Sequence, residues 1–211
     1  MKNKIIACIC IVCGIAIMAV PFFYHFRGKD RTDKLISQFE QQLEDSGYEE
    51  NEERVEQEEK TEQKKKISKE DETILSGQNV IGIIKIDSID IRYPIVEGSD
   101  SESIAYAIGH MSETAGIGKK GNCVLCGHNG SRNGTFFTNL NQIAIGDNVQ
   151  ILDSAGREHI YKVCETYIVD PDDDTVKGHT DDEILTLLTC ANWGTQRFIC
   201  RCIPVDTGKG G

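Results

Sequence analysis

The stretch T-L-L-T-C-A-N-W-G-T-Q-R-F, from Thr186 to Phe198, joins two apolar runs through a short polar segment. Apolar and β-branched residues precede Cys190, and Arg197 opens the second run. This pattern predicts two strands of a β-hairpin, in which the chain returns Arg197 toward Cys190. By itself the stretch leaves two readings open. Cys190 is either a buried strand residue or a nucleophile that a strand end presents beside a cation.

Short apolar runs of the same kind recur from about residue 78 to the end of the chain. We expect strands over 81–86, 91–96, 121–128, 148–152, 158–169, 184–189 and 197–203, and short helices over 101–108 and 134–143. About eight short strands with single helices between some of them predict an all-β fold with short helices, closed or nearly closed into a barrel.

The N-terminal part has a different composition. Residues 5–23 contain no charged side chain, which is about the length that crosses a bilayer of roughly 30 Å as a helix. We expect an uncleaved membrane anchor here, with a cleaved signal peptide as the alternative. Lysine and arginine flank both ends of this stretch, so the charges leave its orientation open.

An acidic segment follows the predicted anchor. Residues 40–72 contain fourteen Asp and Glu against six Lys and Arg. The spacing of Leu35, Ile36, Phe39 and Leu43 predicts a first helix, and beyond Gly47 too few apolar residues remain to form a core. The net charge of the chain is -11. Because phosphate binding needs clustered Lys and Arg, this balance argues against a nucleic acid partner.

The cysteine spacing raises the possibility of a metal site. Cys123-x-x-Cys126 and Cys200-x-Cys202 resemble thiolate pairs of zinc proteins. Side chains alternate along a strand, however, so Cys123 and Cys126 are expected on opposite faces. We therefore favour buried cysteines over a metal or redox site, and we expect Cys200 and Cys202 in the core, on the strand face opposite Arg197.

Among the histidines, His128 alone closes a strongly apolar strand and opens a loop rich in Gly, Asn and Ser. His110, His159 and His179 lie in or beside polar, turn-prone stretches, and His25 adjoins the predicted anchor. A thiol, an imidazole and a guanidinium on neighbouring strand ends could catalyse acyl transfer. Each of these residues also has an ordinary reading, as a core cysteine, a surface histidine or an edge arginine.

The sequence around these residues resembles that of a known family. T-L-L-T-C followed closely by Arg, with G-H-N upstream, is similar to the sortases, cysteine transpeptidases of mainly Gram-positive bacterial surfaces. G-I-I-K-I-D-S-I-D-I-R-Y-P-I-V-E-G resembles the opening strand pair of that family. I-G-H-M…G-N-C-V-L-C-G-H resembles its approach to the histidine, and F-F-T-N-L-N-Q-I-A-I-G-D the segment that follows. The resemblance covers residues of about 80–205.

The resemblance implies a sortase-like eight-stranded β-barrel and a role for each site residue. Cys190 would attack a substrate carbonyl to form a thioester acyl-enzyme. His128 would protonate the leaving amine and then deprotonate the incoming nucleophile, and Arg197 would hold the substrate backbone and the oxyanion. We expect no cofactor and no metal, because the carboxylates that form calcium sites in some sortases cannot be matched in this sequence.

Three further residues are expected to support substrate binding or the oxyanion. They are Thr189 and Asn129, which adjoin the thiol and the histidine, and Trp193, which is either a wall of the peptide groove or a surface aromatic. The run Ile168–Val176 is similar to the class D and class E sortases, whereas G-H-N and F-T-N-L occur in more classes, including housekeeping and pilin-type sortases.

The resulting domain division has five parts. They are a short cytoplasmic N-terminus (1–4), a transmembrane anchor (5–24), an acidic, partly helical and partly disordered stalk (25–77), the sortase catalytic domain (78–206) and a C-terminal tail (207–211). The resemblance places the catalytic domain outside the cell. Its expected partners are surface proteins with a C-terminal LPXTG-like sorting signal, an amine acceptor of peptidoglycan or a pilin, and the membrane.

Two alternatives to a transpeptidase stay open at the level of sequence. Water competes with the amine for the same thioester, so the protein could act mainly as a hydrolysing thiol peptidase. A non-catalytic surface domain that binds a sorting motif is the second alternative. It does not require a thiol, an imidazole and a guanidinium together.

Overall fold

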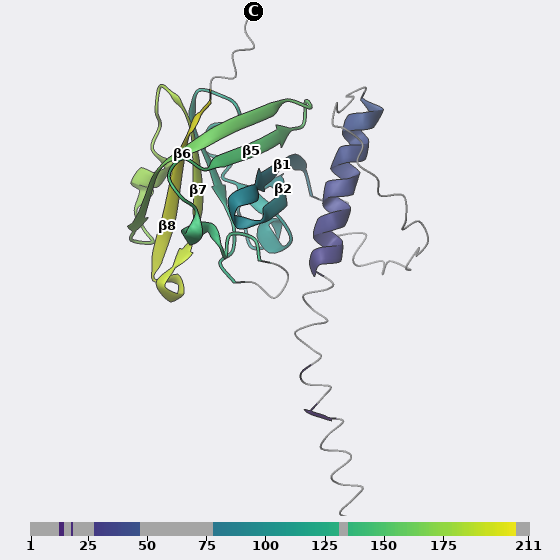
Figure 1. The fold of residues 1–211 in the computed structure, drawn as a ribbon, viewed down its shortest axis with the longest axis horizontal. Helices are drawn as coiled ribbons and strands as arrows, with labels where there is room; N and C mark the ends of the chain where they lie inside the picture. Colours follow the sequence, from purple (N-terminus) through teal and green to yellow (C-terminus); the bar gives the residue numbers. More distant parts are fainter. Residues whose placement is uncertain (1–12, 15–17, 19–27, 47–77, 131–134, 206–211) are drawn as a thin grey trace, which may run out of the picture.

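A computed structural model describes residues 13–14, 18, 28–46, 78–130 and 135–205 of the chain. Within these ranges eight strands form a closed barrel, in the order β1-β2-β3-β4-β7-β8-β6-β5 (Figure 1). The strands are β1 (Val80–Ile86), β2 (Ile91–Glu97), β3 (Ile108–His110), β4 (Gly121–Cys126), β5 (Asn148–Asp153), β6 (Glu158–Val169), β7 (Glu183–Ala191) and β8 (Gln196–Pro204). Short 3-10 helices occupy several connections, namely η1 (Asp87–Ile89), η2 (Ser103–Ala105), η3 (Leu140–Gln142), η4 (Asp174–Lys177) and η5 (Asn192–Gly194).

The barrel interior follows the two-residue alternation of the strands. In β1, Ile84 and Ile86 are fully buried in the core, whereas Lys85 between them is exposed. Strand β4 differs because all six of its residues are buried. Its outer face is covered by the chain around η4, where Asn122 Nδ2 donates to the carbonyl oxygen of Val176 at 2.8 Å. The fold thus surrounds β4 with protein on both faces.

The structure confirms the predicted all-β barrel and corrects three of its elements. Strand β3 is absent from the predicted set because its three residues are too few to show alternation. The predicted helix over 101–108 is wrong: only η2 forms, and Ile108 belongs to β3. The predicted helix over 134–143 is also wrong, because Phe136 has a positive φ of 43° and only η3 forms.

A helix over residues 28–45 lies against the outside of the barrel, beside β1 and β2 (Figure 1). Its apolar side buries Ile36, Phe39 and Leu43 against Ile83 of β1. Polar contacts join the same surfaces: Glu40 forms an ion pair with Arg92 of β2. The helical segment that the apolar spacing predicts is therefore packed on the barrel.

The predicted anchor over 5–24 lies almost entirely outside the described residues. Among the residues that the structure does describe, no helix is both long enough and apolar enough to cross a membrane.

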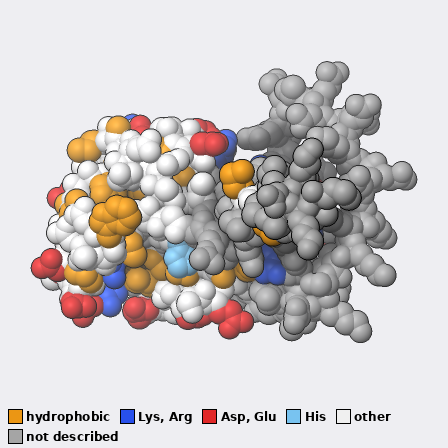
Figure 2. Space-filling view, turned by 90° about the horizontal axis from the view of Figure 1, so that it is seen from below, with side chains coloured by type: hydrophobic (Ala, Val, Ile, Leu, Met, Phe, Trp, Pro, Cys, Tyr) orange, Lys and Arg blue, Asp and Glu red, His pale blue; other side chains and the backbone are white. Residues whose placement is uncertain are grey.

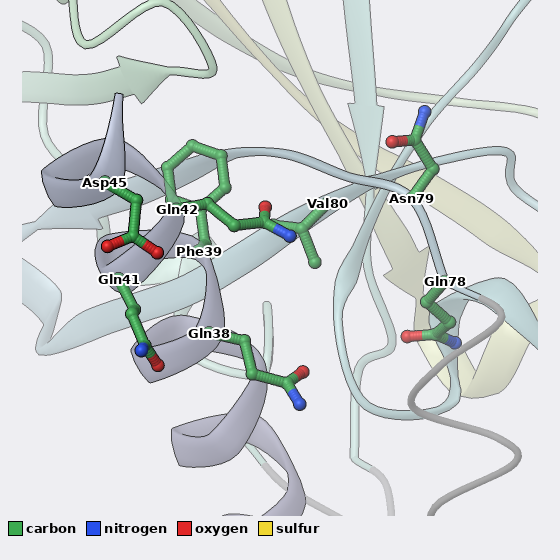
Figure 3. A pocket seen from close by; sticks show the side chains of 8 residues that line it. All are labelled: Gln38, Phe39, Gln41, Gln42, Asp45, Gln78, Asn79 and Val80. Atoms are coloured by element: carbon green, nitrogen blue, oxygen red, sulfur yellow. The ribbon is translucent and has the colours of Figure 1, made fainter. Parts of the chain in front are cut away.

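A groove of about 360 Å³ lies between this helix and the start of β1 (Figure 3). Its walls are mostly carboxamide side chains, and the lining residues are Gln38, Phe39, Gln41, Gln42, Asp45, Gln78, Asn79 and Val80. The pairings Val80↔Val96, Val96↔Gly109 and Gly109↔Cys126 connect the N-terminal end of β1 through β2 and β3 to the C-terminal end of β4.

At the β5–β6 turn, the Asp153 carboxylate is only 5% exposed. It accepts hydrogen bonds from His159 Nε2 at 2.9 Å, from Arg157 Nε at 2.9 Å and from the backbone N–H groups of Ala155 and Arg157. Burial opposes ionisation of this carboxyl, but the hydrogen bonds outweigh it and lower the pKa of Asp153 to about 2. The turn is thus held by an ionised, buried carboxylate.

We predict that Asp153→Asn lowers the free energy of unfolding at pH 7 by about 2 kcal/mol, because the pKa is well below its value in an unfolded chain. A carboxyl with a lowered pKa stabilises the fold above pH of about 4, and this stabilisation disappears as the pH falls toward 2. Urea unfolding at several pH values measures the difference. Asp172→Asn, at an exposed loop position, is the matched control. An equal loss at pH 7 and at low pH would contradict the assignment.

Candidate active site

The parallel pairing of β4 with β7 sets the relative positions of His128 and Cys190. Cys126 pairs with Leu188 at the end of the ladder. The backbone N–H of Gly127 then donates to the carbonyl oxygen of Leu188 at 3.1 Å. Because His128 lies two residues beyond Cys126 and Cys190 two residues beyond Leu188, the two residues leave adjacent strands at the same level. Adjacent strands are about 4.8 Å apart.

Two side chains extend this connection past the end of the ladder. Thr189 Oγ1 donates to the carbonyl oxygen of Gly127 at 2.8 Å, and Asn129 Nδ2 donates to the carbonyl oxygen of Cys190 at 2.7 Å. These hydrogen bonds hold the residues on both sides of His128 to β7. The backbone around the histidine is therefore fixed relative to the thiol.

Arg197 reaches the same end of the barrel through the antiparallel pairing of β7 with β8. It is the register partner of Cys190, as the hairpin pattern predicts. Its Nη1 donates to the carbonyl oxygens of Gly194 and Gln196, each at 3.0 Å. The guanidinium thus fastens the β7–β8 connection, in which Asn192, Trp193 and Gly194 all have positive φ.

The thiol of Cys190 is half-buried, unlike those of β4. Burial raises the pKa of Cys126 to about 11 and that of Cys123 to about 12, so both stay protonated at neutral pH. Among the described residues, no hydrogen bond joins the Cys190 thiol to His128 or Arg197. The strand register and the hydrogen bonds of Thr189 and Asn129 hold these three residues at one end of the barrel, where Cys190 is partly exposed.

The imidazole of His128 is half-buried and contacts the ring of Phe136. The ring of Phe136 meets it edge-on, with 6.0 Å between ring centroids and an interplanar angle of 66°. Burial disfavours the charged form and lowers the pKa of His128 below its ordinary value. At neutral pH the histidine is therefore mostly neutral and is able to accept a proton.

The three supporting residues of the sequence analysis occupy different environments. The hydroxyl of Thr189 is 2% exposed and donates to Gly127, so it is turned away from the thiol side. The carboxamide of Asn129 contacts the Cys190 backbone. Trp193 is fully exposed on η5. Thr189 and Asn129 thus connect the two strands, while Trp193 contacts nothing that defines a groove wall in the described structure.

Two aspects of the site are not evident from the sequence. Phe136, which contacts His128, lies in a segment that the periodicity assigns to a helix. His110, which its sequence neighbours suggest is near solvent, is only 5% exposed. Its Nδ1 lies 3.1 Å from the Glu97 carboxylate and its Nε2 lies 2.9 Å from the carbonyl oxygen of Ala115. His110 is therefore a buried, fully bonded residue of the barrel.

The remaining cysteines of β8 lie in the core. Cys200 and Cys202 are fully buried, and their sulfur atoms are 3.7 Å apart. This confirms their predicted position. Cys123 also belongs to the core cluster, whereas Cys126 of the same strand does not.

The molecule seen from below shows the end that carries the β7–β8 connection (Figure 2). A histidine side chain lies there among mostly hydrophobic and uncharged side chains, and acidic side chains lie along one edge of the view. Such a surface suits a peptide substrate, whose backbone carries no charge.

The model of the sortase domain family matches residues 84–205. The chain belongs to the sortase family. The sortases are cysteine transpeptidases, so the half-buried thiol at the end of β7 lies in a fold that is built for acyl transfer. The matched segment begins in β1 and ends just after β8, and it thus contains the whole barrel except the first residues of β1.

Several known sortases are similar to this one. Sortase A of Bacillus anthracis is 27% identical over 190 residues, which are 90% of this chain and 87% of that protein. Sortase D of Bacillus subtilis strain 168 is 33% identical over 111 residues, which are 52% of this chain and 53% of the relative. The chain thus spans most of the first protein and about half of the second.

A solved structure of Clostridium perfringens sortase C with the C-terminal cell wall sorting motif is 29% identical. It covers 61% of this chain and 71% of its own, with a TM-score of 0.57. Sortases A, C and D are all among the similar proteins. The comparisons therefore establish the family rather than the class.

We predict that Thr189→Val lowers the free energy of unfolding by about 1–3 kcal/mol, because the buried carbonyl of Gly127 loses its hydrogen bond. Thr166→Val is the matched control. Thr166 lies on β6, and its hydroxyl makes no hydrogen bond to the part of the chain that the structure describes. Chemical denaturation of both variants measures the difference, and equal stabilities would show that the Thr189 bond contributes nothing.

We predict that the His128 imidazole titrates below the ordinary histidine value of about 6.5. NMR titration of the ring protons, assigned with a His128→Gln variant, measures this pKa. A blocked histidine peptide in the same buffer serves as the reference. A midpoint for His128 at or above that of the peptide would contradict the buried environment described here.

Proposed function

We propose that Cys190, His128 and Arg197 are the catalytic residues of this sortase, and that it cleaves the C-terminal sorting signal of surface proteins. The observation that carries the proposal is the meeting of a half-buried thiol and a half-buried imidazole at the ends of two adjacent parallel strands, with Arg197 opposite the thiol. A thiol nucleophile needs a proton acceptor and a group that stabilises negative charge, and this constellation supplies both.

The first half-reaction releases the C-terminal part of the substrate. Neutral His128 accepts the thiol proton, and the Cys190 sulfur forms a bond to the carbonyl carbon of the scissile peptide. The tetrahedral intermediate then collapses, the C–N bond breaks, and His128 returns the proton to the leaving amine. The product that remains on the enzyme is a thioester.

The second half-reaction transfers the acyl group. An incoming amine attacks the thioester carbon and gives its proton to His128. The C–S bond breaks and a new amide bond forms, so that the net reaction exchanges one amide for another. We propose that the amine belongs to peptidoglycan or to a pilin subunit.

Arg197 is proposed to stabilise the oxyanion and to hold the substrate backbone. Its Nη1 already donates to two carbonyl oxygens of the β7–β8 connection. These bonds orient the planar guanidinium, whose other N–H groups make no hydrogen bond to the described residues. A fixed fork of donors beside the thiol is suited to a carbonyl oxygen that gains charge.

Thr189 and Asn129 are proposed to act indirectly, by keeping the ends of β4 and β7 in register. Trp193 is proposed as a contact for substrate residues next to the scissile bond, because it is fully exposed in the connection between the thiol strand and the arginine strand. The proposed location of the catalytic domain is outside the cell membrane, with residues 5–24 as a single-pass anchor.

The first prediction for this function concerns the thiol. Cys190→Ala is expected to lower turnover of a fluorogenic sorting-signal peptide by about 10³-fold or more, because the nucleophile is lost. Cys164→Ala, at an exposed thiol of β6, is the matched control and keeps full activity. Retention of activity in Cys190→Ala would rule out the mechanism.

The second prediction for this function concerns the guanidinium of Arg197. Arg197→Lys is expected to lower turnover by about 10²-fold, since an ammonium lacks the planar fork of donors. Arg201→Lys is the control, because position 201 lies on the same strand and carries a positive charge both before and after the substitution. Equal rates for the two variants would place Arg197 outside the site.

The acceptor is tested by adding an amine such as triglycine to the same assay and identifying the products by mass spectrometry. A peptide joined to the amine is the expected product. Hydrolysed peptide alone, at every amine concentration, would instead support the hydrolysing thiol peptidase.

A further inference from the structure

Tyr93 of β2 has contacts at the Cys190 end of the barrel that the mechanism does not use. Its hydroxyl accepts a hydrogen bond from the backbone N–H of Thr135 at 3.1 Å, and it lies 2.8 Å from Thr135 Oγ1. One phenol oxygen thus makes two contacts with a single residue 42 positions away in the sequence. These contacts tie β2 to the segment that follows the loop after His128.

The ring of Tyr93 continues this connection toward the histidine. It packs on the ring of Phe136, with 4.9 Å between centroids and an interplanar angle of 35°. Phe136 in turn meets the His128 imidazole edge-on at 6.0 Å. The Phe136 ring therefore contacts both the Tyr93 ring and the His128 imidazole.

Phe136 has a backbone conformation that needs external support. Its φ of 43° is in the left-handed region, which bulky residues rarely adopt, and Phe136 is only 1% exposed. The neighbouring backbone is joined to the histidine strand, because Asn129 bridges to Phe136 and the N–H of Phe137 donates to the carbonyl oxygen of His128 at 3.0 Å. Any shift of Phe136 is thus transmitted to His128.

We infer that Tyr93 is a positioning residue, which fixes the His128 imidazole through Thr135 and Phe136. Its hydroxyl holds the backbone before Phe136, and its ring packs against the Phe136 ring. The inference deepens the proposed function and rests on it for its effect on catalysis. Tyr93 itself touches no reacting atom.

The contacts of the Tyr93 hydroxyl are expected to affect activity more than stability. The hydroxyl contacts with Thr135 are exposed, so water replaces them when the hydroxyl is removed. The midpoint of thermal unfolding is therefore expected to change little when the hydroxyl is removed. The orientation of the imidazole is not restored by water, and small misplacements of a catalytic group cost up to about 10²-fold in rate.

The test compares three variants of the full chain, Tyr93→Phe, Tyr93→Leu and Tyr106→Phe. The first removes the hydroxyl and keeps the ring pair, and the second removes both. Tyr106→Phe is the matched control, because the Tyr106 hydroxyl also has a hydrogen-bond partner, Arg31, but on the helix over 28–45. Circular dichroism and thermal unfolding check that each variant folds.

Two readouts are measured on each variant. The kcat for a sorting-signal peptide is expected to fall by about 10-fold in Tyr93→Phe and by about 10²-fold in Tyr93→Leu, with KM changed by less than about 2-fold. The NMR titration of His128 is expected to move toward the ordinary histidine value in Tyr93→Leu, because the ring gains solvent when its support is lost. Both quantities stay unchanged in Tyr106→Phe.

The two readouts separate failure of the inference from failure of the proposed function. A Tyr93→Leu variant that folds and keeps both kcat and the His128 titration would overturn the inference. A shifted titration with an unchanged kcat would support the positioning of His128 by Tyr93 and contradict the catalytic role of His128. If Tyr93→Leu does not fold, Tyr93→Phe decides: an unchanged kcat in that variant would then overturn the inference.

Discussion

The site depends on one constraint, the parallel pairing of β4 with β7. Two strands that run in the same direction end at the same edge of a sheet, so the residues that follow them meet there although they are far apart in the sequence. This pairing joins Gly121–Cys126 to Glu183–Leu188 and thereby brings His128 to the level of Cys190. The antiparallel return of β8 then places Arg197 opposite the thiol. The rest of the barrel closes around these three strands and keeps their register.

Burial distinguishes Cys190 from most other thiols of the domain. Cys123, Cys126, Cys200 and Cys202 are all buried, and burial raises the pKa of Cys123 and Cys126. Cys164 is exposed, but its thiol donates to the carbonyl oxygen of Arg201 on the outer surface of the barrel. Cys190 combines partial exposure with a histidine and an arginine at neighbouring strand ends. Partial burial of His128 lowers the pKa of its imidazole below the ordinary histidine value.

The sequence predicts the local parts of this arrangement and misses those that depend on barrel closure. The hairpin from Thr186 to Phe198 follows from alternation and loop length, and the Cys190–Arg197 pair is where that pattern places it. The pairing of β4 with β7 has no local signal, because the two strands are separated by β5 and β6. Strand β3 has only three residues, and Phe136 breaks a helical periodicity through a positive φ that contacts with Tyr93 support. The helix over 28–45 is evident from its apolar spacing, whereas its docking on β1 is a tertiary contact.

The proximity of His128 to Cys190 is tested most directly by placing a charge on the thiol and measuring the pKa of the histidine. A Cys164→Ala background removes the exposed thiol of β6, and methanethiosulfonate reagents attach either a sulfonate or a quaternary ammonium group to Cys190. Peptide mapping confirms the modification, and NMR gives the His128 titration. A nearby negative charge stabilises the imidazolium and a positive charge destabilises it. The account predicts that the pKa of His128 is higher with the sulfonate than with the ammonium, and identical values for the two labels would contradict it.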